Sequence, residues 1–291
     1  METQAPGGVY MCQLDQGVSC GACCGLYNIN DASYASIHLM LEKRTLAFQN
    51  VERKVDAIDA FGEWAYSDNC ADRPLPRFHH CPYLGLIGDD LDRVGCLLHP
   101  LGKGNNKTDW RGLSYYGGLA CNTYFCPTHN KTKAIFKKTV QNAVLNEAVN
   151  NKNPAGWYLY GLIITENDLL NAILTHIENK AGRCITHDDI SGNLPFLSNV
   201  YKLLNLKLTW PYRKNRIFVH YFFNDGQYKR ESIDYQAITC TVSRYDVIFK
   251  HLCSKFENKE QLNEAEFFME KHVNDAAESL IAFTHNNNSY R

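Results

Sequence analysis

The sequence predicts a mainly α-helical protein with a small β-hairpin, in which a loop-rich, metal-stapled module precedes a helical domain. Glycine and proline interrupt the first 130 residues at short intervals, whereas helical periodicity dominates the remainder. One β-rich segment with a hairpin turn lies within that remainder, and nine of the twelve cysteines lie in the first 126 residues. We therefore expect a cysteine-cluster module at 1–130 and a mainly helical domain at 131–291.

The amino-terminal module contains one long helical pattern, at 31–60. Apolar residues recur there at roughly helical spacing, and either Asp31 or Ser33 is suited to cap the first turn. The rest of the module is rich in turns and has little regular backbone pairing. Such a segment needs cross-links other than a continuous core, and a bound metal would provide them.

The second half predicts a series of helices. An amphipathic pattern covers 131–150, a short apolar helix covers 154–164, and a third helix begins near Thr165 and ends before Gly182. A further helix is expected at 194–206. The segment 216–223 is β-rich, Asn224-Asp225-Gly226 predicts a turn, and 227–235 is the expected return strand. Two closing helices are expected at 242–256 and 260–283.

Composition restricts the function and the location of the protein. The chain of 291 residues carries 30 basic and 31 acidic side chains, and this balance does not favour nucleic acid or an anionic membrane as the partner. We see no signal peptide at the start, and the longest apolar stretch, 157–164, is far shorter than a bilayer requires. We expect a cytoplasmic protein, in which clustered cysteines are more often metal ligands than disulfides.

Seven cysteines form a pattern typical of a metal site. Cys20, Cys23 and Cys24 make a C-x-x-C-C motif, and two thiols separated by two residues can face one ion, as in zinc and iron–sulfur knuckles. Two later cysteines lie next to residues that favour turns: Cys81 precedes Pro82, and Cys96 follows Gly95. The expected ligands are Cys20, Cys23, Cys24, Cys81, Cys96, Cys121 and Cys126.

Seven thiols exceed the four that a tetrahedral zinc ion or a [4Fe–4S] cluster requires. The additional cysteines have three possible roles: they surround the ligands, they bind a second metal, or they are buried thiols without a metal. Cys24 is the weakest ligand of its motif on geometry alone, because adjacent side chains diverge. The remaining cysteines are expected to be small buried side chains, and they are Cys12, Cys70, Cys184, Cys240 and Cys253.

The thiol-only ligand set favours an iron–sulfur cluster over zinc, because structural zinc sites commonly include histidine. Four histidines lie close to the cysteines in sequence, and they are His79, His80, His99 and His129. A single histidine is more often a hydrogen-bonded residue than a ligand, and we expect that role for all four. His129 has ligand spacing to Cys126 and is the one alternative donor.

The order of these motifs resembles a family of cysteine-cluster proteins described as zinc- or iron-chelating, whose relatives include flagellin lysine N-methylase. The resemblance covers about residues 18–128. It implies a metal or iron–sulfur site on the cysteines of the C-x-x-C-C motif, on Cys81 and Cys96, and on one or both of Cys121 and Cys126. The sequence departs from the family pattern at His99, where arginine is usual, and by the inserted residues 101–120 before Cys121. No methylase catalytic residue is matched, so the catalytic residues are unknown.

These patterns leave three hypotheses for the function. The first is a metal-binding protein whose iron–sulfur cluster or zinc has a structural or redox role. The second, from the resemblance, is an enzyme similar to a protein-lysine N-methylase. The third is an interaction or nucleic-acid-binding module that uses the basic segment 201–230 around Lys214 and Arg216, although near-neutral charge argues against nucleic acid.

Overall fold

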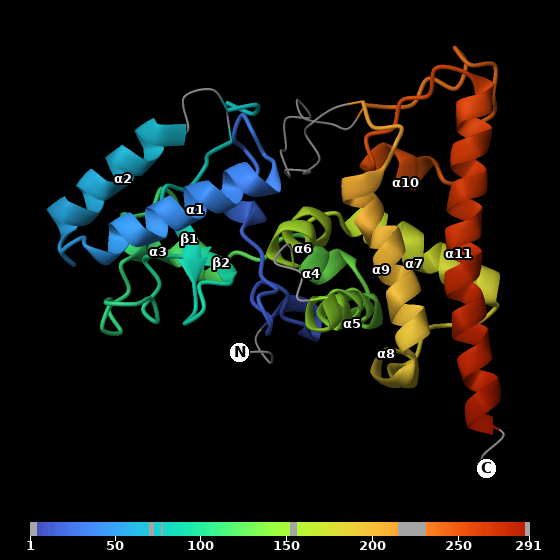
Figure 1. Ribbon diagram of the computed structural model, residues 1–291, viewed down its shortest axis with the longest axis horizontal. Coiled ribbons are helices and arrows are strands. Elements are labelled where there is room, and N and C mark those ends of the chain that lie inside the picture. The colour runs from blue at the N-terminus through green and yellow to red at the C-terminus, as the bar shows by residue number, and fades with distance from the viewer. Residues whose placement is uncertain (1–4, 70–72, 77, 152–155, 215–230, 289–291) are drawn as a thin grey trace. The chain divides into compact units, whose positions relative to one another are not determined.

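The computed structural model describes residues 5–69, 73–76, 78–151, 156–214 and 231–288 (Figure 1). The chain divides into two compact units. The first, here the cysteine unit, comprises Cys12–Cys126 and Pro154–Gly161; the second, here the helical unit, comprises Met1–Met11, Pro127–Asn153 and Leu162–Arg291. The described residues are mainly helical and contain one two-stranded antiparallel hairpin, which confirms the predicted fold class.

The cysteine unit begins its regular structure with two helices, α1 (Tyr34–Gln49) and α2 (Val55–Asn69), where the sequence predicted one. The backbone N–H of Ser36 donates to Ser33 Oγ at 3.3 Å, so Ser33 is the cap. The helices are separate because the Arg53 guanidinium donates to the Phe48 carbonyl at 2.9 Å and to the Val51 carbonyl. The Phe48 carbonyl also accepts from Val51 N at 3.1 Å, so Arg53 adds a second donor there and fixes the chain between the two helices.

The hairpin pairs β1 (Leu84–Ile87) with β2 (Arg93–Cys96), in a register that sets Leu84 opposite Cys96. It lies within a segment that the sequence had predicted to be a loop. Thr45 of α1 fixes the hairpin to the helix, because its hydroxyl accepts from Leu86 N at 2.7 Å and donates to Leu86 O at 3.1 Å. The hairpin predicted at 216–235 lies outside the described residues over 215–230, and 231–234 have no regular structure.

Three short elements complete the cysteine unit beside the start of α6 (Gly156–Ile164). They are the 3₁₀ turns η3 (Ala22–Cys24) and η4 (Arg111–Leu113) and the helix α3 (Gly117–Thr123). The turn η4 contacts α3, so the inserted residues 101–120 fold onto the segment that carries Cys121.

The helical unit contains three long helices that pack together, α7 (Asn167–Ala181), α9 (Leu194–Thr209) and α11 (Lys259–Asn288) (Figure 1). Helix α5 (Ala134–Asn151) packs on α9. Shorter elements join them, namely η2 (Pro6–Gly8), α4 (Thr128–Lys131), α8 (His187–Gly192) and α10 (Asp246–His251). Gly182 ends α7 with φ of +66°, as predicted. The closing helix expected at 242–256 is confined to α10.

A buried ion pair ties three of these helices together. Lys207 of α9 donates to Glu166 Oε1, just before α7, at 2.7 Å, and to the carbonyl of His251 in α10 at 2.7 Å. The second Glu166 oxygen lies 2.7 Å from His251 Nδ1. Lys207 and Glu166 are almost completely buried, so each charge depends on the other for compensation. Within the described ranges no helix combines the length and apolarity needed to cross a membrane.

Candidate metal centre

The C-x-x-C-C motif forms a tight turn. Ala22–Cys24 is a single 3₁₀ turn, and Gly25 ends it in the left-handed conformation with φ of +80°. Cys23 and Cys24 lie within this turn, and their side chains are hydrogen-bonded to each other. Cys20 lies just before the turn, on the other side of Gly21.

Cys12 lies directly beside this motif. Gln13 and Ser19 form an antiparallel bridge, and the N–H of Cys20 donates to the Cys12 carbonyl at 2.9 Å. The side chains of Gln13 and Ser19 both hydrogen-bond to the backbone of Val94, at 2.9 and 2.8 Å. Because side chains alternate across a strand, Cys12 and Cys20 both face the opposite side. The sequence predicted a small buried side chain at Cys12; in the structure Cys12 is half-buried and lies opposite Cys20.

Two further cysteines approach Cys24 through the backbone. The N–H of Cys81 donates to the Cys24 carbonyl at 2.8 Å, so the two residues are adjacent although they are 57 positions apart in sequence. Leu84 N donates in turn to the Cys81 carbonyl at 3.4 Å, and Leu84 pairs with Cys96 across the hairpin. The hairpin thereby places Cys96 next to the loop that carries Cys81.

Cys121 and Cys126 come from the last segment of the cysteine unit. Cys121 lies on α3 and is exposed, and its sulfur is 3.1 Å from Ser114 Oγ. Cys126 is half-buried and lies beyond the end of α3. Its charge raises the pKa of Cys12, after the larger effects of burial and Cys23.

Burial and mutual repulsion raise the pKa of most of these thiols. Burial first and the neighbouring Cys96 second raise the pKa of Cys81 to about 12. Burial also raises the pKa of Cys96 to about 11 and raises that of Cys20. Cys23 is the exception, because a hydrogen bond from Cys24 lowers its pKa and raises that of Cys24. Thiols with raised pKa values are protonated at neutral pH. Because metals bind the thiolate form, a bound ion must displace these protons.

Backbone N–H groups are already directed at three of the sulfurs. The sulfur of Cys20 accepts from Ala22 N, that of Cys81 from Tyr83 N, and that of Cys96 from Leu98 N. In each case the donor lies two residues after the cysteine, and the bond favours the thiolate form. Hydrogen bonds of this kind also tune the reduction potential of iron–sulfur clusters.

Arg44 of α1 places a buried positive charge beside Cys81. Its guanidinium donates to the Cys81 carbonyl at 3.2 Å and to the Ala65 carbonyl at 2.9 Å, and it lies 2.8 Å from His80 Nε2. Arginine is only a donor, so Nε2 accepts and His80 Nδ1 donates to the Gly25 carbonyl at 2.8 Å. Burial first and Arg44 second lower the pKa of His80 to about 3, so this histidine is neutral and hydrogen-bonded.

A cavity of about 590 Å³ adjoins the loop that carries Cys81. Among its lining residues are His79, Tyr83, Tyr115, Arg73 and Glu63. The His79 ring stacks on Tyr115 with a centroid separation of 5.1 Å, and burial lowers its pKa to about 4. The cavity therefore has aromatic walls and charged groups of both signs.

Among the residues that the structure describes, no group of three or more Cys, His, Asp or Glu side chains is placed to hold a metal ion. The thiols are brought together by backbone contacts, and the direction of each sulfur depends on one side-chain torsion. No cysteine of the described segments is in a disulfide. Cys184 is exposed and Cys240 and Cys253 are half-buried, so the predicted burial of these three was wrong; Cys70 lies outside the described residues.

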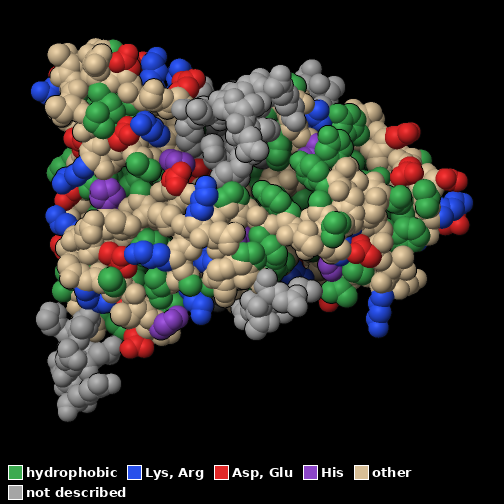
Figure 2. All heavy atoms as spheres, turned by 180° about the vertical axis from the view of Figure 1, so that it is seen from behind, with side chains coloured by type: hydrophobic (Ala, Val, Ile, Leu, Met, Phe, Trp, Pro, Cys, Tyr) green, Lys and Arg blue, Asp and Glu red, His purple; other side chains and the backbone are tan. Residues whose placement is uncertain are grey.

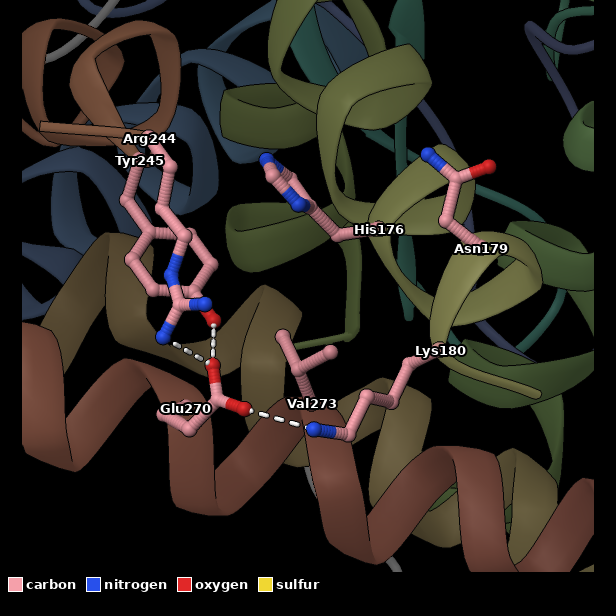
Figure 3. A pocket seen from close by; sticks show the side chains of 7 residues that line it. All are labelled: His176, Asn179, Lys180, Arg244, Tyr245, Glu270 and Val273. Carbon is pink, nitrogen blue, oxygen red and sulfur yellow. Dashed lines mark hydrogen bonds and ion pairs between the residues drawn. The ribbon is translucent and has the colours of Figure 1, made fainter. Parts of the chain in front are cut away.

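A smaller cavity, of about 210 Å³, lies in the helical unit (Figure 3). Glu270 receives Lys180 at 2.9 Å, Arg244 at 2.6 Å and the hydroxyl of Tyr245. The hydrogen bonds from Lys180 and Tyr245 lower the pKa of Glu270. Since its carboxylate already has three donors, we interpret this group as a link between α7 and α11 rather than as a reactive site.

Comparison of the chain with family models, with curated proteins and with solved structures finds no match. The likeness of the cysteine motifs to the zinc- or iron-chelating family therefore stays a prediction from the sequence.

Proposed function

We propose that the protein binds a thiophilic metal through the cysteine unit, as an iron–sulfur cluster in preference to zinc, with a structural or redox role. The ligands that the sequence predicts are Cys20, Cys23, Cys24, Cys81, Cys96, Cys121 and Cys126. The observation that carries the proposal is the backbone approach of Cys81 to Cys24, because it joins two motifs that are distant in sequence.

The donor set suits such a group. Thiols dominate it, and N–H groups directed at the sulfurs of Cys20, Cys81 and Cys96 stabilise the thiolates that a metal requires. His80, which precedes Cys81 in sequence, is held in two other contacts, so a mixed site with that ring is not favoured. When bound, an iron–sulfur cluster supplies one-electron transfer, whereas zinc supplies a cross-link.

Elemental analysis and a visible spectrum test the proposal, on full-length protein purified without oxygen and without a metal-binding tag. Iron, inorganic sulfide and a broad brown absorption that bleaches on reduction are the expected result. Stoichiometric zinc without colour would retain the metal site and remove the redox role. Protein that contains neither metal, and that takes up neither one after reduction of its thiols, would refute the proposal.

One observation favours the enzyme that the resemblance implies. The cavity beside Cys81 offers about 590 Å³, within the range of small-molecule sites. A methylase predicts saturable binding of S-adenosylmethionine, measured by calorimetry on metal-loaded protein. Mutation of Tyr115 to Ala should weaken that binding, because the ring lines the cavity. Equal heats for ligand and buffer would remove the enzyme hypothesis while leaving metal binding intact.

The third hypothesis concerns the basic segment 201–230, of which 215–230 lie outside the described residues. Lys214 pairs with Glu231 at 2.8 Å. Figure 2 shows basic and acidic side chains interspersed over one face of the molecule. Neither observation favours binding to nucleic acid, which depends on clustered positive charge.

A further inference from the structure

We infer that the cavity of about 590 Å³ beside the Cys81 loop binds a free amino acid with an apolar or aromatic side chain. Arg73 contacts the carboxylate of this ligand, and Asp59 and Glu63 contact its ammonium group. The inference concerns the cavity that the enzyme hypothesis also uses, but it depends neither on S-adenosylmethionine nor on a bound metal.

The cavity lies within the cysteine unit, and one of its walls is a face of α2. The lining residues of this helix recur at a spacing of three or four, and they are Asp59, Gly62, Glu63 and Tyr66. Tyr83 packs directly on the helix, because a Cβ atom at Gly62 would lie 2.3 Å from its hydroxyl oxygen. That hydroxyl also donates to the Ile58 carbonyl at 3.3 Å, so Tyr83 is held against α2.

Arg73 supplies positive charge to the cavity. Its guanidinium donates to the Tyr66 hydroxyl at 2.9 Å and to the Pro76 carbonyl at 3.3 Å, and it lies 5.4 Å from the centre of the Tyr66 ring. These contacts hold the group in place and use two of its five N–H groups. Among the residues that the structure describes, no carboxylate forms an ion pair with Arg73. Its remaining N–H groups are therefore available to the carboxylate of a ligand.

Asp59 and Glu63 supply negative charge to the same cavity. They precede Tyr66 by seven and three residues, which corresponds to about 10 Å and about 4.5 Å along the helix axis. Over the described ranges neither carboxylate forms an ion pair with a basic side chain. Charges of opposite sign thus line one cavity without pairing with each other.

A ligand with both an ammonium and a carboxylate group matches this arrangement better than a ligand with one charge. A cation alone would leave Arg73 without a counter-charge, and an anion alone would meet two carboxylates. The rest of the lining is largely apolar and includes Pro82, Leu113 and Tyr115, which suit an apolar or aromatic side chain.

Three ligands with the same phenyl group test the inference on full-length protein as purified. L-Phenylalanine carries both charges, 2-phenylethylamine carries only the ammonium group, and 3-phenylpropionate carries only the carboxylate. Titrations followed by ligand NMR signals give the three dissociation constants. We expect phenylalanine to bind about fivefold more tightly than either analogue, the contribution of one ion pair at a partly exposed site. L-Leucine should also bind.

Substitutions assign each charge to its partner. Arg73→Gln should weaken phenylalanine about fivefold and leave 2-phenylethylamine unchanged. The double variant Asp59→Asn with Glu63→Gln should weaken phenylalanine without weakening 3-phenylpropionate. Asp56→Asn is the control, because Asp56 is exposed one turn earlier on α2 and does not line the cavity, and it should leave all three constants unchanged.

Equal affinity for the three ligands would overturn the inference, as would the absence of saturable binding by both phenylalanine and leucine to folded protein. Unchanged affinity for phenylalanine in Arg73→Gln would also overturn it. Circular dichroism confirms that each variant is folded. Binding of phenylalanine without binding of S-adenosylmethionine would remove the enzyme hypothesis and leave this inference in place.

Discussion

Gly25→Ala tests whether the backbone contact between the C-x-x-C-C turn and the Cys81 loop holds the candidate centre together. Gly25 has φ of +80°, and a Cβ atom there would lie 2.1 Å from the His79 carbonyl oxygen and 2.9 Å from His80 Cα. Both obstacles are backbone atoms, so no side-chain rotation relieves the clash. The alanine variant must therefore move the His79–His80 segment away from the turn, and Cys81 moves with it.

Two effects set the size of the destabilisation. An alanine in the left-handed region costs about 1–2 kcal/mol. The forced displacement of packed backbone adds about 1–3 kcal/mol, the range observed for overpacked interiors. The sum, about 2–5 kcal/mol, is a large share of the 5–15 kcal/mol that keeps a domain folded. We therefore expect a clear loss of stability in the cysteine unit together with loss of bound metal.

Two glycines of the same unit provide matched controls. Gly117 has φ of +76° but open space around its Cβ position, so Gly117→Ala carries the backbone cost alone. Gly112 has neither a positive φ nor a neighbour within 4 Å, and Gly112→Ala should be close to neutral. Urea unfolding followed by circular dichroism measures all three, beside metal content. If Gly25→Ala is no more destabilising than Gly117→Ala, the close approach of the turn to the Cys81 loop is wrong.

Further predictions concern the helical unit. Lys207→Met should lower the free energy of unfolding by about 3–5 kcal/mol in urea titration, because it leaves the Glu166 carboxylate buried without its cation; a change below 1 kcal/mol would contradict the pairing. Asp189 accepts bonds from Arg183 and Thr186, which lower its pKa despite burial. The stability from that carboxylate is present above the unfolded pKa near 4 and is lost as pH falls through the lower folded value. Asp189→Asn should therefore flatten the acid side of the stability profile against pH, and an unchanged profile would exclude this role.

The sequence predicted the fold class because helical periodicity and capping are local signals. Gly182 and the apolar spacing of 165–180 define α7 without reference to the rest of the chain. The break between α1 and α2 was missed, since it depends on Arg53 reaching back to the Phe48 carbonyl. The hairpin at β1 and β2 was missed as well, because its short strands contain Gly85 and Gly95 and carry little β-propensity.

At the candidate site too, the sequence revealed local patterns but not contacts between residues that are distant in sequence. Spacing alone identified the C-x-x-C-C turn and the cysteines that follow it. Cys12 has no spacing signal, because its relation to Cys20 comes from a ladder whose partners Gln13 and Ser19 both bond to Val94, about 75 residues away in sequence. The charge that Arg44 places beside Cys81 was equally hidden, since an arginine in a helix is usually exposed.

Cysteine labelling with mass-spectrometric mapping tests the central claim most directly. Full-length protein is alkylated under native conditions, before and after removal of its metal, and each cysteine is scored separately. The account predicts that the half-buried Cys20, Cys23 and Cys96 are protected only while metal is bound, whereas the exposed Cys184 reacts in both states. Labelling of these three cysteines that does not change when metal is removed would contradict the assignment of a metal centre to this unit.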